Sequence, residues 1–267
     1  MRRLGSPAVR MRRLHRLEPA AIFGVMSRDV TNFATFWKAT TFSSVIEPTI
    51  YLLAFGLGVG TLVSTVQGLD YVQFVGTGMV ATSVLFASAL SAMFGTFVKH
   101  RFQRTYDAIL AAPVDTEELV SAEILWMSAR AGVYGCAPLL VSMLFGLDPS
   151  PGMLVVPFIG FLTALGFAGF GVLMAAVVSK IDSFNYVTTT VITPLFLVSG
   201  TFFPIDELPE WAQVLANVNP LYHCVQLVRH AVFGFETADL AHAAVLIGFA
   251  VLMWRLAIWR LQKRLID

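Results

Sequence analysis

Long apolar runs alternate with short polar segments along most of the chain. Six of the runs hold about 20 mainly apolar residues, the length that an α-helix needs to cross roughly 30 Å of hydrocarbon. They are 40–63, 71–98, 124–147, 153–178, 184–203 and 240–259. The pattern therefore predicts an all-α integral membrane protein with six transmembrane helices, and an even number places both termini on one side.

A different pattern precedes the first apolar run. Five apolar residues recur at helical spacing, and polar residues occupy the other faces; the five are Ile22, Met26, Val30, Phe33 and Trp37. This segment is too polar to span, so it predicts an amphipathic helix lying in the membrane interface. We accordingly divide the chain into a basic N-terminus with an interfacial helix (1–38) and a six-span transmembrane domain (39–267).

Composition agrees with a membrane protein. The 267 residues are 57% hydrophobic and 13% charged, and the mean hydropathy is +0.73, whereas an average soluble domain is about 25% charged. A formal net charge of +1 gives no indication of nucleic-acid binding. The two cysteines, Cys136 and Cys224, are far apart in apolar surroundings and are interpreted as packing residues.

The distribution of charge predicts the orientation. Lys and Arg gather before the first span, at the start of the polar segment 99–123 and after the last span, whereas the connections on the other side carry mainly Asp and Glu. Because basic residues accumulate on the cytoplasmic side, we expect both termini and segment 99–123 to be cytoplasmic.

Segment 99–123 is the most polar internal stretch of the chain. We expect a short helix at 106–110, ended before Pro113 because the residue preceding a proline disfavours helix. A second helix then starts at Asp115 and leads into the third span, with Glu117 and Glu118 in the first turn, where the helix dipole favours acids.

The segment 204–236 is predicted to lie outside, yet it is rich in apolar residues. Two helical patterns are separated by Asn219-Pro220, which predicts a re-entrant helical hairpin between spans five and six. We expect no metal site at His223, His230 and Cys224, because their spacing does not suit one helix face and no carboxylate accompanies them.

Some polar residues inside the spans have two interpretations. Glu47 is either a functional carboxylate or a residue near the headgroups beside a helix-bending proline. Arg130 either extends to the cytoplasmic face or lines a path. The hydroxyls of the fifth span, at Thr188, Thr189 and Thr193 among others, either bond back to their own helix or line a substrate route.

Two stretches resemble the signature regions of a known family. RTYDAILAAPVDTEELVSAEILW and PLFLVSGTFFPIDELPEWAQVLANVNPLYHCVQLVRHAVFG are similar to those of ABC-type exporter permeases of the type-2 class. The NodJ-like branch of nodulation-factor exporter permeases is the nearest, with daunorubicin-resistance permeases as cousins. The resemblance extends from about Trp37 to the last span and includes IEPTIYLLAFGLG in the first.

The resemblance implies a homodimeric permease working with two separately encoded ATPases, which bind the ATP and magnesium. The chain itself contains no GxxxxGK[ST] loop, so it is not expected to be an enzyme or to bind a cofactor. The implied sites are an ATPase contact (Arg104, Tyr106, Asp107, Glu117 and Glu118), a substrate path (Thr188, Thr189, Thr193, Phe196 and Ser199) and an outer gate (Phe203, Trp211 and Tyr222).

The predicted function is export of an amphipathic or lipid-linked substrate, such as a lipo-oligosaccharide or glycolipid or a hydrophobic drug, across a bacterial inner membrane. An ion-coupled secondary transporter is an alternative, although inverted repeats and charges at mid-depth are not evident. A non-transporting membrane scaffold is another. An intramembrane enzyme would need a constellation such as HExxH, which is absent from the sequence.

Overall fold

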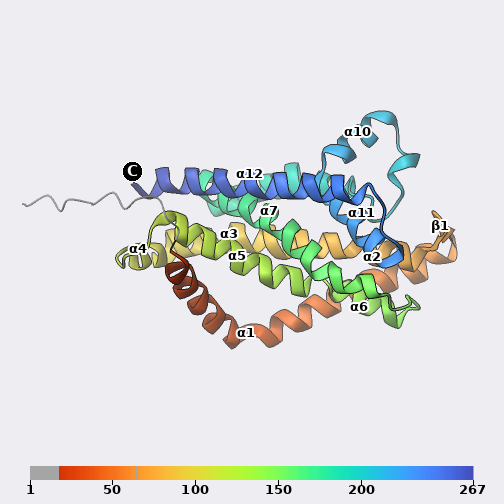
Figure 1. The fold of residues 1–267 in the computed structure, drawn as a ribbon, viewed down its shortest axis with the longest axis horizontal. Coiled ribbons are helices and arrows are strands. Elements are labelled where there is room, and N and C mark those ends of the chain that lie inside the picture. Colours follow the sequence, from red (N-terminus) through yellow and green to blue (C-terminus); the bar gives the residue numbers. More distant parts are fainter. Residues whose placement is uncertain (1–17, 64, 267) are drawn as a thin grey trace, which may run out of the picture.

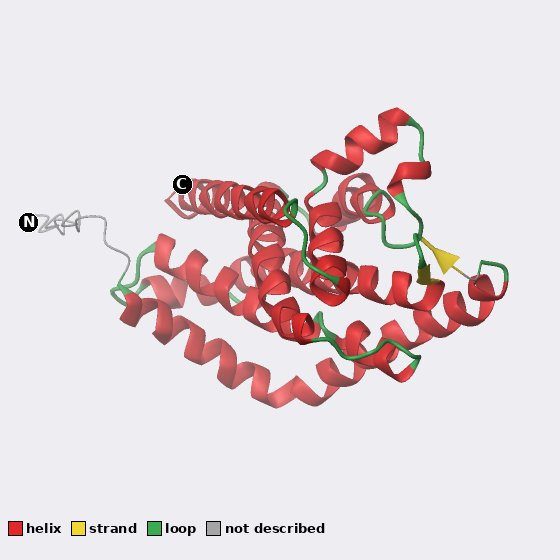
Figure 2. Cartoon of the chain, turned by 45° about the vertical axis from the view of Figure 1, so that its right-hand side comes forward, coloured by secondary structure: helices red, strands yellow, loops and turns green. Residues whose placement is uncertain are grey.

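The computed structural model describes residues 18–63 and 65–266, and the basic segment 1–17 lies outside the described residues. Within them the fold is a bundle of long helices, accompanied by one two-stranded antiparallel hairpin, β1 (Thr65–Val66) with β2 (Leu69–Asp70) (Figure 2). The start of α1, the short helix α4 and the C-terminal end of α12 lie at one end of the bundle, and the hairpin lies at the other (Figure 1).

Five helical stretches in the described residues are long and apolar enough to cross a membrane. They are Pro19–Thr61, Tyr71–Phe102, Thr116–Leu144, Pro151–Val177 and Asp239–Leu265. Each contains most of one predicted span, so the all-α membrane fold is confirmed. The predicted fifth span is not among them.

The first stretch runs across the predicted division between residues 38 and 39. A single helix, α1 (Pro19–Leu53), contains both the predicted interfacial helix and most of the first span, and η1 (Ala54–Gly58) and η2 (Val59–Thr61) extend it. Its two halves run in different directions (Figure 1). Within α1, Thr40 and Thr41 donate to the carbonyls of Phe36 (3.5 Å) and Trp37 (2.9 Å), a type of bond that bends helices.

The other four stretches are also built from consecutive elements. The second contains α2 (Tyr71–Leu85), η3 (Phe86–Leu90), α3 (Ser91–Phe97) and η4 (Val98–Phe102). The third contains α5 (Thr116–Tyr134) and α6 (Ala137–Leu144), the fourth η5 (Pro151–Val155) and α7 (Val156–Val177), and the last is α12 (Asp239–Ile266). The separate helix α4 (Thr105–Leu110) lies between the second and the third.

The predicted fifth span, 184–203, is shorter in the structure. After η6 (Ile181–Ser183), three consecutive elements form it: α8 (Phe184–Val187), η7 (Thr188–Ile192) and α9 (Thr193–Leu197). The helix ends at Leu197 because Val198 leaves the helical conformation (φ −97°, ψ 35°) and Gly200 has φ +78°, which favours glycine. The predicted C-terminal boundary of the fifth span, residue 203, was therefore wrong.

This shorter segment nevertheless runs along the second stretch. The ring of Phe184 packs on Phe97 (centroids 5.3 Å apart) and that of Phe196 on Phe86 (5.7 Å). Farther on, the hydroxyl of Thr201 is 3.3 Å from the carbonyl oxygen of Gly78. Positions 184–201 thus follow positions 97–78 in the antiparallel direction.

The segment that follows contains η8 (Ile205–Glu207), α10 (Glu210–Val218) and α11 (Pro220–Phe233). The predicted helix break is confirmed: Asn219 accepts from the backbone NH of Leu221 and so caps α11. Its side-chain amide also donates to the carbonyls of Leu195 (2.7 Å) and Val198 (3.0 Å). Asn219 therefore ties the start of α11 to the end of α9.

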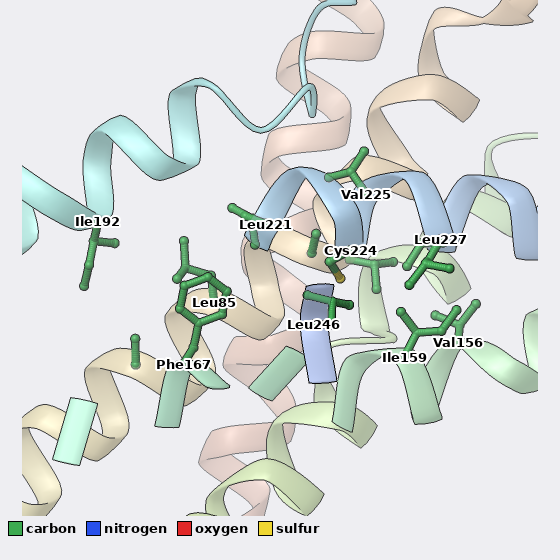
Figure 3. Close-up of a cluster of buried hydrophobic side chains, with 14 of the residues drawn as sticks. Leu85, Val156, Ile159, Phe167, Ile192, Leu221, Cys224, Val225, Leu227 and Leu246 are labelled. Carbon is green, nitrogen blue, oxygen red and sulfur yellow. The ribbon is translucent and has the colours of Figure 1, made fainter. Parts of the chain in front are cut away.

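The largest buried cluster joins α7, α11 and the second stretch. Leu85, Phe167, Leu221 and Val225 are among its members, and none is more than 1% exposed (Figure 3). Helices α5 and α7 approach closely where the Cα of Gly132 would lie 3.3 Å from a Cβ at Gly160. Small residues of this kind let membrane helices pack backbone against backbone.

Candidate functional site

A buried cluster of charges lies at the end of the bundle that carries α4. The ammonium group of Lys99 (η4) is 2.7 Å from both carboxylate oxygens of Glu123 (α5), and it is 3.2 Å and 3.3 Å from those of Asp29 (α1). The two acids are only 1% and 4% exposed. One lysine therefore holds together three helices that are distant in the sequence.

Tyr106 lies beside this charge cluster. It was predicted to contact an ATPase, but its side chain is only 1% exposed and packs with Val25, Leu119 and Ile124 in one hydrophobic cluster. Burial raises the pKa of Tyr106 well above its ordinary value, so the phenol stays neutral. Tyr106 thus anchors α4 to the bundle and presents almost no surface to a partner.

Glu118 is a second predicted contact residue that faces inward. Its carboxylate accepts from the backbone NH of Asp115 (2.9 Å), which completes a capping box at the start of α5, and from the NH of Glu18 (2.8 Å). The predicted start of this helix is confirmed. Glu117 accepts from the side-chain amide of Gln262 in α12 (3.0 Å), so both acids connect elements of this end.

Arg104 and Asp107 are the predicted contact residues that remain exposed. Arg104 precedes α4 in the left-handed conformation, with φ 49°. Ala108, Ala111 and Ala112 are exposed near them, so the outer surface of α4 combines two opposite charges with small side chains. We call this surface the α4 face, defined by Arg104, Asp107, Ala108, Ala111 and Ala112.

A cavity of about 730 Å³ lies farther along the bundle. One wall is α1 from Ala39 to Tyr51, and a second is formed by α2, η3 and the start of α3 from Met79 to Ser91. The α5 residues Arg130, Ala131 and Tyr134 line it as well, together with Phe196 and Phe202. Glu47 and Arg130, for which the sequence left two interpretations open, thus face the same cavity.

Two hydroxyls of the predicted substrate path, those of Thr193 and Ser199, form hydrogen bonds within their own segment. The hydroxyl of Thr193 donates to the carbonyl of Thr188 (3.0 Å), and that of Ser199 to the carbonyl of Phe196 (2.7 Å). Thr189 is exposed. Phe196 is the member of this set that lines the cavity.

The residues of the predicted outer gate do not form one group. Phe203 and Trp211 are 39% and 67% exposed, whereas the ring of Tyr222 packs against the rings of His223 (5.6 Å) and His242 (6.1 Å). The apolar surface of α10 around Trp211 is exposed, while α11 is largely buried. The structure therefore places these three side chains in different surroundings.

Histidines cluster between α11 and α12. The statement that no carboxylate accompanies them was wrong, because Asp239 lies 2.5 Å from Nδ1 of His230. The Nδ1 atoms of His223 and His242 are 2.6 Å apart. Among the residues that the structure describes, no group of three or more His, Cys, Asp or Glu is arranged to hold a metal ion.

The sequence also missed a buried arginine in α11. The guanidinium of Arg229 lies 3.6 Å from the ring centroid of Phe74 and donates to the carbonyls of Phe74 (3.2 Å) and Gly200 (2.7 Å). The signal in the sequence was that Arg229 lies in the predicted external segment 204–236, whereas the other basic residues lie on the predicted cytoplasmic side. Lys99 and Glu123 gave a weaker signal, since each is a charge at the border of an apolar run, whereas Asp29 lies within the amphipathic segment before the first run.

Comparison with known proteins identifies the family. The pattern of the ABC-2 type transporter family matches residues 20–233. Nodulation protein J of Sinorhizobium fredii is 31% identical over 86% of this chain and 90% of its own length. Nodulation protein J of Rhizobium meliloti is 32% identical over 86% and 89%. The inner membrane transport permease YadH of Escherichia coli K12 is 27% identical over 91% and 95%. The chain therefore belongs to the ABC-2 type transporter family, as a membrane permease that is not itself the ATPase.

Proposed function

We propose that the chain is the membrane permease of an ATP-driven exporter in a bacterial inner membrane. Two copies form a homodimer and work with two ATPase subunits, which bind ATP and magnesium. Both termini and segment 99–123 are cytoplasmic. The observation that carries this proposal is the α4 face: an exposed charged surface whose base, Tyr106, is buried beside an ion cluster that joins three helices.

The geometry suits transmission of motion from an ATPase to the spans. Tyr106 packs against residues of α1 and α5, and its neighbour Lys99 is bonded to both of these helices. Because packed helices move as rigid elements, displacement of α4 acts on α1, η4 and α5 together. We infer that closure of the ATPases moves α4 and that the spans follow.

We further propose six membrane crossings. The segment from Phe184 to Thr201 follows the second stretch from position 97 to position 78. These positions are nineteen residue steps apart, or about 28 Å of helix at 1.5 Å per residue, which matches the hydrocarbon thickness of roughly 30 Å. The exposed apolar surface of α10 supports its placement in the outer leaflet, as part of a re-entrant hairpin at 204–236.

The proposed cargo is an amphipathic or lipid-linked molecule, such as a lipo-oligosaccharide or glycolipid, with a hydrophobic drug as the second candidate. The relatives named for nodulation support the first. The cavity supports an amphipathic cargo in general, because charged groups, hydroxyls and aromatic rings line it together.

Charge reversal on the α4 face tests the proposal. Asp107→Arg combined with Arg104→Glu should reduce stimulation of the ATPase by the permease, and transport, by about tenfold or more, equivalent to at least about 1.4 kcal/mol of contact free energy. Both side chains are exposed, so thermal unfolding of the permease should be unchanged. ATPase activity and transport are measured in proteoliposomes containing the permease and the ATPase with which it copurifies.

Lys180→Glu is the matched control, since Lys180 is an exposed charge between α7 and η6, outside the α4 face. It should leave both activities within about twofold of the wild type, as expected for an isolated surface charge. Full coupling in the doubly reversed variant would contradict docking on the α4 face. Absence of any copurifying ATPase would contradict the exporter function itself.

A further inference from the structure

Two charged side chains line the cavity, Arg130 and Glu47, and neither forms a hydrogen bond or ion pair with another described residue. The guanidinium of Arg130 lies 5.8 Å from the ring centroid of Phe33, but in the described part of the chain it makes no hydrogen bond or ion pair. Glu47 likewise has no such partner among the described residues. Charges within membrane spans normally pair or line a path for a polar ligand, so this arrangement indicates a missing partner.

The two charges do not neutralise each other, because they lie at different depths. Tyr134, one turn after Arg130 in α5, is hydrogen-bonded to Thr41 of α1 (2.9 Å). Glu47 lies six residues farther along α1, or about 9 Å at 1.5 Å per residue. Arg130 thus lies toward the end of the cavity where Thr41 lies, and Glu47 lies farther along α1.

Four serines on the cavity wall also form no side-chain hydrogen bond within the described part of the chain. Serine and threonine hydroxyls in membrane helices usually donate to a carbonyl of the preceding turn, as Thr49 does to Val45 (2.6 Å) and Ser88 to Val84 (2.6 Å). In the described residues no such bond is formed by the cavity serines, which are Ser43, Ser44, Ser83 and Ser91. Their hydroxyls are therefore available to a bound molecule.

Apolar side chains complete the wall. Phe86, Leu90 and Phe196 line the cavity together with the polar groups, and an aromatic or aliphatic wall suits the apolar part of an amphiphile. The volume of about 730 Å³ lies within the usual range for small-molecule sites, roughly 300–1,000 Å³. One headgroup with the start of its acyl chains fits these dimensions.

We propose that this cavity binds the headgroup of an amphiphile that carries both an acidic group and hydroxyl groups. Arg130 donates to the phosphate or carboxylate, since a guanidinium matches the geometry of either. Glu47 accepts hydrogen bonds from the hydroxyls of the headgroup, and the four serines donate to its oxygens. The role of this molecule as cargo rests on the proposed export function, whereas its binding does not.

Lipid retention by the purified full-length permease tests the binding. The chain is placed in nanodiscs with equal amounts of phosphatidylglycerol (acid and hydroxyls), glucosyl diacylglycerol (hydroxyls alone) and phosphatidylcholine (no hydroxyls), and retained lipid is measured by native mass spectrometry. The wild type should retain phosphatidylglycerol best. Arg130→Gln should lower that retention by about tenfold, the effect of losing about 1.4 kcal/mol, and Glu47→Gln should lower retention of the glucosyl lipid.

Two variants control for folding and for charge in general. Arg130→Lys keeps the cation and should retain more phosphatidylglycerol than Arg130→Gln, although less than the wild type, because lysine lacks the planar fork. Arg255→Gln removes an exposed guanidinium of α12 that does not line the cavity, and it should leave retention unchanged. Equal retention of phosphatidylglycerol by the wild type and Arg130→Gln would overturn the proposal.

A second measurement separates cargo from resident lipid. The copurifying ATPase and ATP are added, and movement of fluorescent phosphatidylglycerol between leaflets is followed. Movement that is lost in Arg130→Gln supports the cargo role. Retention that depends on Arg130 without any ATP-driven movement establishes the binding site for a resident lipid and overturns the cargo role alone.

Discussion

Lys99→Met is expected to destabilise the permease by about 3–5 kcal/mol, because it leaves the buried carboxylate of Glu123 without its cation and leaves Asp29 with Arg28 alone, at 3.2 Å. Asp29 and Glu123 are 4% and 1% exposed, and both accept from the lysine. The methionine side chain has a similar length but cannot donate. The amount of protein in the membrane fraction and the unfolding temperature of the purified chain in detergent measure the effect.

Matched variants distinguish loss of the buried ion pairs of Lys99 from the general effect of replacing a lysine. Lys38→Met changes an exposed lysine of α1 and should alter the unfolding temperature little. Adding Glu123→Gln to Lys99→Met should recover part of the loss, since one uncompensated charge is removed. If Lys99→Met unfolds at the wild-type temperature, the cluster does not stabilise this end of the bundle.

Much of the helical architecture could be predicted from the apolar runs. Five of the predicted spans coincide over most of their length with helical stretches long enough to cross a membrane. Local signals located further elements: Pro113 follows α4, Asp115 caps α5, and Asn219 separates α10 from α11. These features are determined by residues a few positions apart in the sequence, so they can be predicted from a short stretch of sequence.

The direction of individual side chains was harder to predict. Tyr106 and Glu118 were assigned to an ATPase contact from their position in a polar segment, but Tyr106 packs against Val25, and Glu118 accepts from the NH of Glu18, one hundred residues away. Contacts between distant segments decide which face of a short helix is covered, and no periodicity in six residues can indicate this.

The residues that line the cavity could not be predicted from short stretches of sequence either. Hydroxyls were expected to matter in the fifth span, where the run of threonines is most evident, yet Thr193 and Ser199 bond to their own segment. The cavity serines, which form no hydrogen bond to another described residue, belong to α1, α2 and α3, and they meet because α1 lies beside the second stretch there. Their common surroundings depend on tertiary packing.

Gly132→Leu is expected to have the second large effect, by separating α5 from α7. A Cβ at this position would lie 2.9 Å from the backbone nitrogen of Phe161 and from the carbonyl oxygen of Pro157. Backbone atoms cannot rotate away as a side chain can, so the helices must move apart, at a cost of about 3 kcal/mol. Unfolding temperature and membrane abundance are measured as for Lys99→Met.

Separation of these helices should also impair binding, because α5 carries Arg130 on the cavity wall two residues before Gly132. Gly248→Leu is the control: it changes another helical glycine, in α12, where a Cβ meets no atom within 4 Å. The control should unfold close to the wild-type temperature, and Gly132→Ala should lie between the two leucine variants, since one methyl group demands a smaller displacement. If Gly132→Leu is as stable as the wild type, α5 and α7 do not need this close approach. The positions of Arg130 and Glu123 then depend on other contacts of α5, foremost the bonds from Lys99 to Glu123.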